Sequence, residues 1–144
     1  MVREIVIFGD PVLRKKCAKV KSFSDEIKSL VDDMLETMVS AEGIGLAAPQ
    51  IGVPIQLAVI DVSHDPECVS YLKIDGKEVQ LKDIMPLVFI NPELEYGEKD
   101  DVMSEGCLSF PDIRGDVIRP YDLKVSLDIM GSKRVTLETD GLLA

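Results

Sequence analysis

A series of short strand-like segments after Gly52 limits the fold more than any other feature. The runs PIQLAVIDV, YLKI, KEVQL, PLVFINP, DLKVSLDIM and RVTLE are rich in β-branched residues and bounded by turn residues. Asp75-Gly76 predicts a two-residue hairpin turn, and Gly131-Ser132 predicts a weaker one. Strands that follow one another through tight turns pair antiparallel. We therefore expect an α+β fold built on antiparallel β-strands rather than a wound parallel sheet.

An amphipathic helix is expected before these strands. Apolar residues recur at helical spacing from Ile27 to Val39, which predicts one apolar stripe. Ser22 or Ser24 can cap the start of this helix, and Gly43 lies just past its end. We interpret the methionines in the stripe as core residues rather than as a binding surface.

Composition indicates one domain over residues 1–144. A chain of 144 residues with 46% hydrophobic content is enough to build a single core. The net charge of −10 argues against direct binding of nucleic acid, because nucleic-acid binders gather Lys and Arg on one face. The first residues contain no signal peptide and no spanning helix, which favours a cytoplasmic protein without membrane contact. The three cysteines do not suggest a disulfide framework, because their number is odd and their spacing irregular.

Three further segments carry local predictions. Residues 63–83 are expected to form a hairpin excursion, and the acidic residues 95–101 a solvated turn. Near the end of the sequence, Thr139 or Asp140 is predicted to cap a helix, with residues 142–144 in its first, buried turn.

Two segments have residues that suggest a function as well as a structural role, and the first is GIGLAAPQIG, residues 43–52. Its small residues would let a substrate or another backbone approach closely, and the amide of Gln50 can donate to a carbonyl oxygen. The structural alternative is a tight connection from helix to strand.

The segment EGCLSFP, residues 105–111, is the second. Cys107 within it is a metal ligand, a nucleophile or an inert core residue. A nucleophilic cysteine needs a base, and the only histidine, His64, lies in a distant turn that we expect at the surface. Pro66 weakens a helical metal pair of His64 with Cys68.

In this order, GIGLAAPQ and EGCLS resemble the first two signature motifs of the peptide deformylases. DPVLRKK, residues 10–16, resembles the N-terminal segment of that family, so the resemblance covers nearly the whole chain. In the family an HExxH motif follows a DGLLA-like stretch, whereas this sequence ends at Ala144. The resemblance therefore implies a deformylase domain that is truncated at its C-terminus and lacks the metal-binding helix.

The resemblance also implies a reaction. Peptide deformylases hydrolyse the N-formyl group from the initiator formyl-methionine of nascent polypeptides near the ribosome and release formate. The family uses ferrous iron, with zinc or nickel as substitutes. Cys107 corresponds to one metal ligand, while the two histidine ligands and the catalytic glutamate are absent from this sequence. We therefore expect these 144 residues alone to bind no stoichiometric metal and to be inactive.

Further site residues are implied in the same way. Gln50 and the backbone N–H of Leu108 match the donors to the oxyanion, and Gly45 matches a backbone contact to substrate. Gly43 and Ile44 flank the methionine pocket of the family. The remaining matches are Leu142, which lines that pocket, Arg114, which contacts the peptide, and Glu105 with Arg119 as a supporting ion pair.

Two other functions stay open beside this one. A natural, catalytically dead relative would keep the cleft as a peptide-binding module, and a metal-free enzyme would use the Cys107 thiol. Self-association through an exposed cleft is expected in any of these cases, because an uncovered apolar surface favours it.

Overall fold

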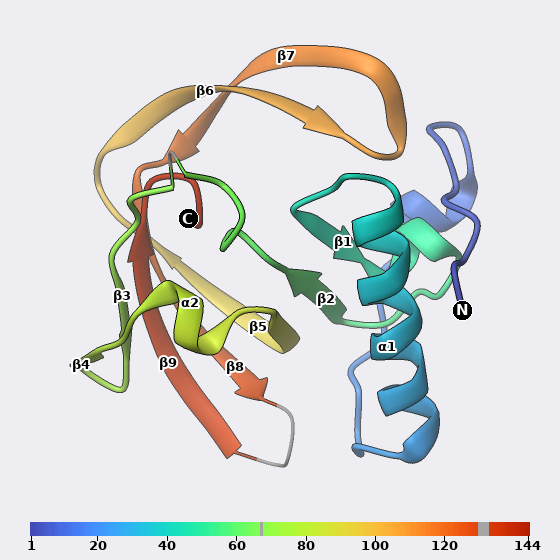
Figure 1. The fold of residues 1–144 in the computed structure, drawn as a ribbon, viewed down its shortest axis with the longest axis horizontal. Helices are drawn as coiled ribbons and strands as arrows, with labels where there is room; N and C mark the ends of the chain where they lie inside the picture. Colours follow the sequence, from blue (N-terminus) through green and yellow to red (C-terminus); the bar gives the residue numbers. More distant parts are fainter. Residues whose placement is uncertain (67, 130–132) are drawn as a thin grey trace.

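The computed structural model describes residues 1–66, 68–129 and 133–144, which form two β-sheets, one long helix and three short helical turns (Figure 1). In chain order the elements are η1 (Pro11–Arg14), α1 (Asp25–Ser40), β1 (Gly45–Ala47), η2 (Ala48–Ile51), β2 (Leu57–Ile60), β3 (Leu72–Ile74), β4 (Lys77–Glu78), α2 (Leu81–Ile84), β5 (Leu87–Tyr96), β6 (Asp100–Cys107), β7 (Phe110–Pro120), β8 (Asp122–Ile129) and β9 (Lys133–Asp140).

The larger sheet has seven strands in the order β1-β2-β5-β8-β9-β3-β4, and β6 and β7 form a separate two-stranded sheet. Neighbouring strands in both sheets pair antiparallel. The predicted α+β fold with antiparallel strands is therefore confirmed. The turn at Asp75-Gly76 is confirmed as well, because both residues have positive φ (49° and 80°) between β3 and β4. The turn predicted at Gly131-Ser132 lies outside the described residues.

Helix α1 begins where the sequence predicted. The Ser24 hydroxyl oxygen accepts a hydrogen bond from the N–H of Ile27 at 3.4 Å, which caps the helix. Met34 and Met38 are fully buried against β1 and β2, so their interpretation as core residues is confirmed. The first core cluster lies on this side of the molecule and consists of Val31, Met34, Met38, Leu46, Ala48, Leu57, Val59 and Ile90.

A second core cluster lies under β3, β8 and β9, away from α1 (Figure 1). Strand β3 pairs with β9, so the segment predicted as an excursion over residues 63–83 is anchored in the main sheet through Leu72 and its neighbours. The buried members of this cluster are Val62, Leu72, Leu87, Val125, Leu127, Val135, Leu137 and Leu143.

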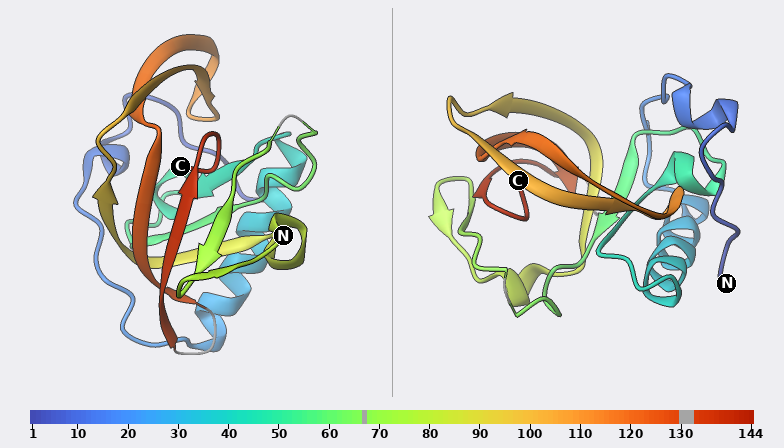
Figure 2. Two further views of the ribbon diagram at one scale, coloured as in Figure 1. Left: turned by 90° about the vertical axis from the view of Figure 1, so that its left-hand side faces the viewer. Right: turned by 90° about the horizontal axis from the view of Figure 1, so that it is seen from above.

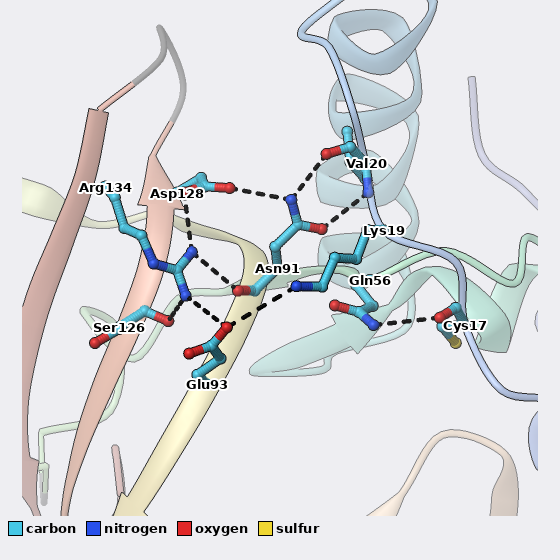
Figure 3. A network of polar contacts seen from close by, with 9 residues as sticks. All are labelled: Cys17, Lys19, Val20, Gln56, Asn91, Glu93, Ser126, Asp128 and Arg134. Atoms are coloured by element: carbon cyan, nitrogen blue, oxygen red, sulfur yellow. Dashed lines mark hydrogen bonds and ion pairs between the residues drawn. The ribbon is translucent and has the colours of Figure 1, made fainter.

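A polar network joins the segment before α1 to strand β5 (Figure 3). The Asn91 side chain accepts from the N–H of Val20 and donates to the Val20 carbonyl, each at 2.8 Å, and it also donates to Asp128 at 3.0 Å. Arg134 donates to Asp128 at 3.0 Å and to the carbonyl of Asn91 at 3.3 Å. Asn91 has a φ of 50°, a conformation that asparagine tolerates better than most residues, and the register of β5 against β8 shifts beside it.

Strands β6 and β7, called the ribbon below, arch over the molecule from the side of β8 to the side of the N-terminal segment (Figures 1 and 2). The register pairs Val102 with Ile118, and both side chains are exposed, at 58% and 69%. The turn predicted over residues 95–101 is shorter in the structure, because β5 continues to Tyr96 and β6 starts at Asp100. The sequence did not predict a strand there, because most side chains of the ribbon are exposed and its residues show no alternation of apolar and polar types.

The helix start predicted at Thr139 or Asp140 is wrong, because both residues belong to β9. The Thr139 hydroxyl donates to the carbonyl of Tyr71 at 2.8 Å, and the Asp140 carboxylate accepts from the N–H of Tyr71 at 2.9 Å. These side chains therefore form hydrogen bonds with the backbone of Tyr71 instead of capping a helix. Leu142 and Leu143 follow in a turn, and Leu143 is buried in the second cluster.

Candidate functional site

One cavity of about 850 Å³ lies beneath the ribbon, between the segment after α1 and the turn after β9. It gathers stretches that are far apart in the sequence: residues 42–45 with Gln50, both strands of the ribbon and residues 141–144. The ten residues to which the resemblance gave a role in the site all line it, namely Gly43, Ile44, Gly45, Gln50, Glu105, Cys107, Leu108, Arg114, Arg119 and Leu142. The segment of residues 43–52 is thus both a connection from α1 to β2 and a wall of the cavity.

Gln50 reaches the cavity from η2, the short turn that ends at Gly52 with a φ of 81°. Its Oε1 accepts the backbone N–H of Ala47 at 2.9 Å, which fixes the orientation of the amide. Nε2 then faces the ribbon and donates to Ser109 Oγ at 3.3 Å, with Cys107 Sγ at 3.7 Å. The amide therefore holds a donor beside Cys107, where a bound carbonyl oxygen can accept from it.

The ribbon turns at residues 107–110, called the tip below, where Cys107 pairs with Phe110. Cys107 is exposed, whereas Ser109 is only 2% exposed. Leu108 packs against the first core cluster, and a Cβ on Gly43 would come within 2.8 Å of its Cδ1. Glycine at position 43 therefore permits this close approach of the Leu108 side chain. The sequence prediction missed Ser109, although a small polar residue inside EGCLSFP was a signal that it contacts another polar group.

Farther along the ribbon, Arg119 donates to both carboxylate oxygens of Glu105, at 3.0 and 2.8 Å. The expected contact of this pair is thus present. The hydrogen bond from Arg119 lowers the pKa of Glu105, and the carboxylate raises the pKa of Arg119 in return. Arg114 donates to the carbonyl of Ser104 at 2.9 Å and also lines the cavity. Two basic residues of β7 therefore face the same space.

The donors available for a metal are few. Across residues 1–66, 68–129 and 133–144, no group of three or more His, Cys, Asp or Glu side chains is placed to hold a metal ion. His64 is 89% exposed, lies 3.9 Å from Asp61 and does not line the cavity. Cys107 is therefore a single thiol donor, and this donor set does not fit a complete metal site with three protein ligands.

Comparison with known proteins identifies the family. A family model for polypeptide deformylase matches residues 2–144. The peptide deformylase of Methylacidiphilum infernorum is 44% identical over 144 residues, which are 100% of this chain and 75% of that protein. The crystal structure of a peptide deformylase from Ehrlichia chaffeensis has a TM-score of 0.87 at 32% identity, covering 100% of this chain and 78% of the other. The peptide deformylase structure from Thermotoga maritima has a TM-score of 0.82 at 34% identity, covering 100% and 85%.

The fold, the polar donors around the cavity and these matches together define a hydrolase of the metal-dependent class. The chain belongs to the peptide deformylase family.

Proposed function

We propose that this protein hydrolyses the N-formyl group of formyl-methionyl peptides and releases formate. Family membership supports the reaction, and one observation carries it: the Gln50 amide donor lies beside Cys107, at the tip that also bears Leu108. The 144 residues act in this proposal as one domain, since both core clusters share the seven-stranded sheet.

Gln50 and the backbone N–H of Leu108 bind the formyl oxygen as negative charge develops on it. Donors that are fixed before the reaction contribute roughly 3–4 kcal/mol each in comparable sites. The contact from Ala47 supports this role, because it fixes the amide with Nε2 directed toward Cys107 and Ser109.

The methionine side chain occupies the apolar part of the cavity. Gly43 and Ile44 flank it, Leu142 lines it, and the backbone of Gly45 contacts the substrate. Glycines at positions 43 and 45 let the substrate come close to the main chain. Arg114 contacts the peptide beyond the methionine. All five residues line the same cavity, which supports this arrangement.

The family is metal-dependent, and we propose ferrous iron as the native metal, with zinc or nickel as substitutes. Cys107 is the donor that this chain contributes. Because the described residues form no group of three or more side chains placed to hold a metal ion, we propose that the remaining donors come from outside them. We therefore expect less than one tightly held metal ion for each chain of 144 residues.

The substrates are nascent polypeptides, so we propose that the protein works in the cytoplasm near ribosomes. No helix in the described part of the chain has both the length and the apolar character needed to cross a membrane. Self-association through the cavity face is part of this proposal, because several large apolar side chains near it, among them Ile44 and Ile113, are exposed.

A peptide-binding module without turnover is the second candidate. The observation that favours it is the single thiol in a cavity that is otherwise complete in apolar walls and polar donors.

Formate release from a formyl-methionyl peptide separates the two. The assay uses this chain and a version extended after Ala144 by a helix with an HExxH motif, each with ferrous iron and without oxygen. We expect the extended version to release formate, Cys107→Ala to remove both metal and activity, and Gln50→Ala to keep metal but lose roughly two to three decades in kcat. A folded, metal-loaded extension without activity would contradict the proposed function and favour the binding module.

A further inference from the structure

The tip of the ribbon has few connections to the rest of the molecule. Of the backbone hydrogen bonds among the described residues, one joins residues 107–110 to another part of the chain: the N–H of Phe8 donates to the carbonyl of Ser109 at 2.8 Å. The Phe8 ring stacks on Phe110 with centroids 4.8 Å apart and an interplanar angle of 30°. Phe8 thus holds the tip through both its backbone and its side chain.

The same N-terminal segment also holds Gln50. The N–H of Val6 donates to the backbone carbonyl of Gln50 at 2.8 Å. In an extended chain the N–H groups of residues i and i+2 lie on the same side. Residues 6–8 are called the strap below. The N–H of Val6 therefore binds Gln50, and the N–H of Phe8, on the same side of the strap, binds the tip.

The strap is itself anchored at its start. Ile5 packs against the first core cluster, and the backbone N–H of Arg3 donates to the buried hydroxyl of Thr37 in α1 at 2.8 Å. The Arg3 guanidinium pairs with Asp33 of the same helix at 2.6 Å. The strap is consequently fixed to the main core before it reaches the tip.

These contacts close a ring. Val6 bonds to Gln50, Phe8 bonds to Ser109, and the Gln50 side chain bonds to Ser109 at 3.3 Å. We propose that Phe8 is a positioning residue: it sets the distance between the Gln50 amide and the Leu108 N–H, the two donors to the formyl oxygen. This inference rests on the proposed function for the identity of the donors. A displacement of about 1 Å between reacting groups can cost on the order of a hundredfold in rate, so a strap that fixes this distance acts on the reaction from outside the cavity.

Phe8 does not line the cavity, and neither does its neighbour Ile7. Ile7 is 57% exposed and Phe8 is 60% exposed, so both side chains present similar surface to solvent. Ile7→Ala is therefore a matched control for Phe8→Ala, since it removes an exposed apolar side chain from the same segment without touching the stack on Phe110.

The first test measures affinity instead of turnover, so it needs no loaded metal. Formyl-methionyl and unformylated methionyl peptides are titrated into the chain, and the dissociation constant of the unformylated peptide divided by that of the formyl peptide reports on contacts to the formyl group. We expect Phe8→Ala to lower this ratio about tenfold and Ile7→Ala to change it by less than about twofold. In a Gln50→Ala background, Phe8→Ala should change the ratio no further, because the donor that it positions is gone. An equal loss in both backgrounds would overturn the inference and leave Phe8 a purely structural role.

The second test does not depend on the function. The side-chain amide NMR signals of Gln50 report on its hydrogen bond to Ser109, and we expect them to move toward the values of a free amide in Phe8→Ala but not in Ile7→Ala. If Phe8→Ala does not fold, Phe8→Leu and Phe110→Leu replace it, because they weaken the stack more mildly. We expect both to move the same signals. Unchanged Gln50 signals in folded Phe8 and Phe110 variants would overturn the inference. A parent chain that fails to distinguish the two peptides, with Gln50 signals that still move, would instead contradict the proposed function alone.

Discussion

The seven-stranded sheet and the ribbon are stabilised in different ways. The sheet buries two apolar clusters, whose side chains such as Met34 and Leu127 are fully removed from solvent. The ribbon pairs its own two strands, has exposed side chains along most of its length, and is held at its tip by Phe8 and Gln50. The part that carries Cys107 and Leu108 therefore depends on a few specific contacts, whereas the part that supports it depends on buried area. Substitutions in the two regions should have separable effects.

The largest effect is expected from the sheet. Leu127→Ala removes a fully buried side chain from the second cluster and should lower the free energy of unfolding by about 2–5 kcal/mol. Ile118→Ala removes an exposed apolar side chain from the ribbon and should change it by less than about 0.5 kcal/mol. Urea unfolding of both variants measures the difference. Similar losses in the two variants would mean that the ribbon contributes to the core, against the comparison made above.

The next effect concerns the polar network around Asn91, which joins β5, β8 and β9 within the sheet. Asn91→Ala removes the hydrogen bonds to both backbone groups of Val20 and to Asp128, and should cost about 1–3 kcal/mol because it leaves partly buried partners unpaired. Glu93→Ala removes only exposed ion pairs with Arg134 and Lys19, and should cost less than about 1 kcal/mol. Thermal and urea unfolding rank the two. A larger loss of stability in Glu93→Ala would mean that the ion pairs of Glu93 stabilise the network more than the hydrogen bonds of the Asn91 amide.

The pH dependence of the ribbon should follow Glu105. The hydrogen bond from Arg119 lowers the pKa of this carboxyl in the folded state, so its contribution is complete above the ordinary glutamate pKa of about 4.3. That contribution is lost as the pH falls through the lowered pKa. The NMR signal of the Arg119 Nε–H, followed in acid, should shift in the parent chain and not in Glu105→Gln. Asp116→Asn, on the same ribbon but outside this pair, is the control and should leave the transition in place.

The smallest effect on stability is expected at Gly43. An added methyl would come within 2.8 Å of Leu108 Cδ1, the end of a side chain that can move, so Gly43→Ala should displace Leu108 at a cost of about 1 kcal/mol. A Cβ at position 45 would meet Ile60 at 3.6 Å, an ordinary contact, so Gly45→Ala is the control. Methyl NMR signals should move for Leu108 in the first variant and stay in place in the second. A larger shift of Leu108 in Gly45→Ala would contradict the packing described here.

The sequence predicted the regions whose signals are local and regular. The stripe from Ile27 to Val39 gave α1 with its cap at Ser24, and Asp75-Gly76 gave a hairpin turn, because periodicity and positive φ are encoded in neighbouring residues. Strands β6 and β7 were both missed, because a ribbon without a buried face has no alternation of polar and apolar residues. Thr139 and Asp140 were misread as helix caps because their side chains bond to Tyr71, which is far away in the sequence.

The candidate site was predictable to the extent that its motifs are contiguous. Residues 43–50 and 105–108 drew attention through glycine and cysteine patterns, and the structure brings them to one cavity. Ser109 and Phe8 were not predicted, because a hydrogen bond to Gln50 and a ring stack on Phe110 arise only when three distant stretches meet.

The three-part origin of the cavity also sets the order in which it is completed during translation. Helix α1, β1, β2 and β5 complete most of the first cluster from residues that precede position 97. The ribbon, strands β8 and β9 and the turn with Leu142 follow them, and at roughly 5–20 residues per second Leu142 is made about 5–20 s after Gln50. The side of the site that carries Gln50 on η2 is thus synthesised before the wall that encloses the cavity. A newly made copy therefore acquires its substrate pocket only after the ribbon and β9 have been added to the first cluster.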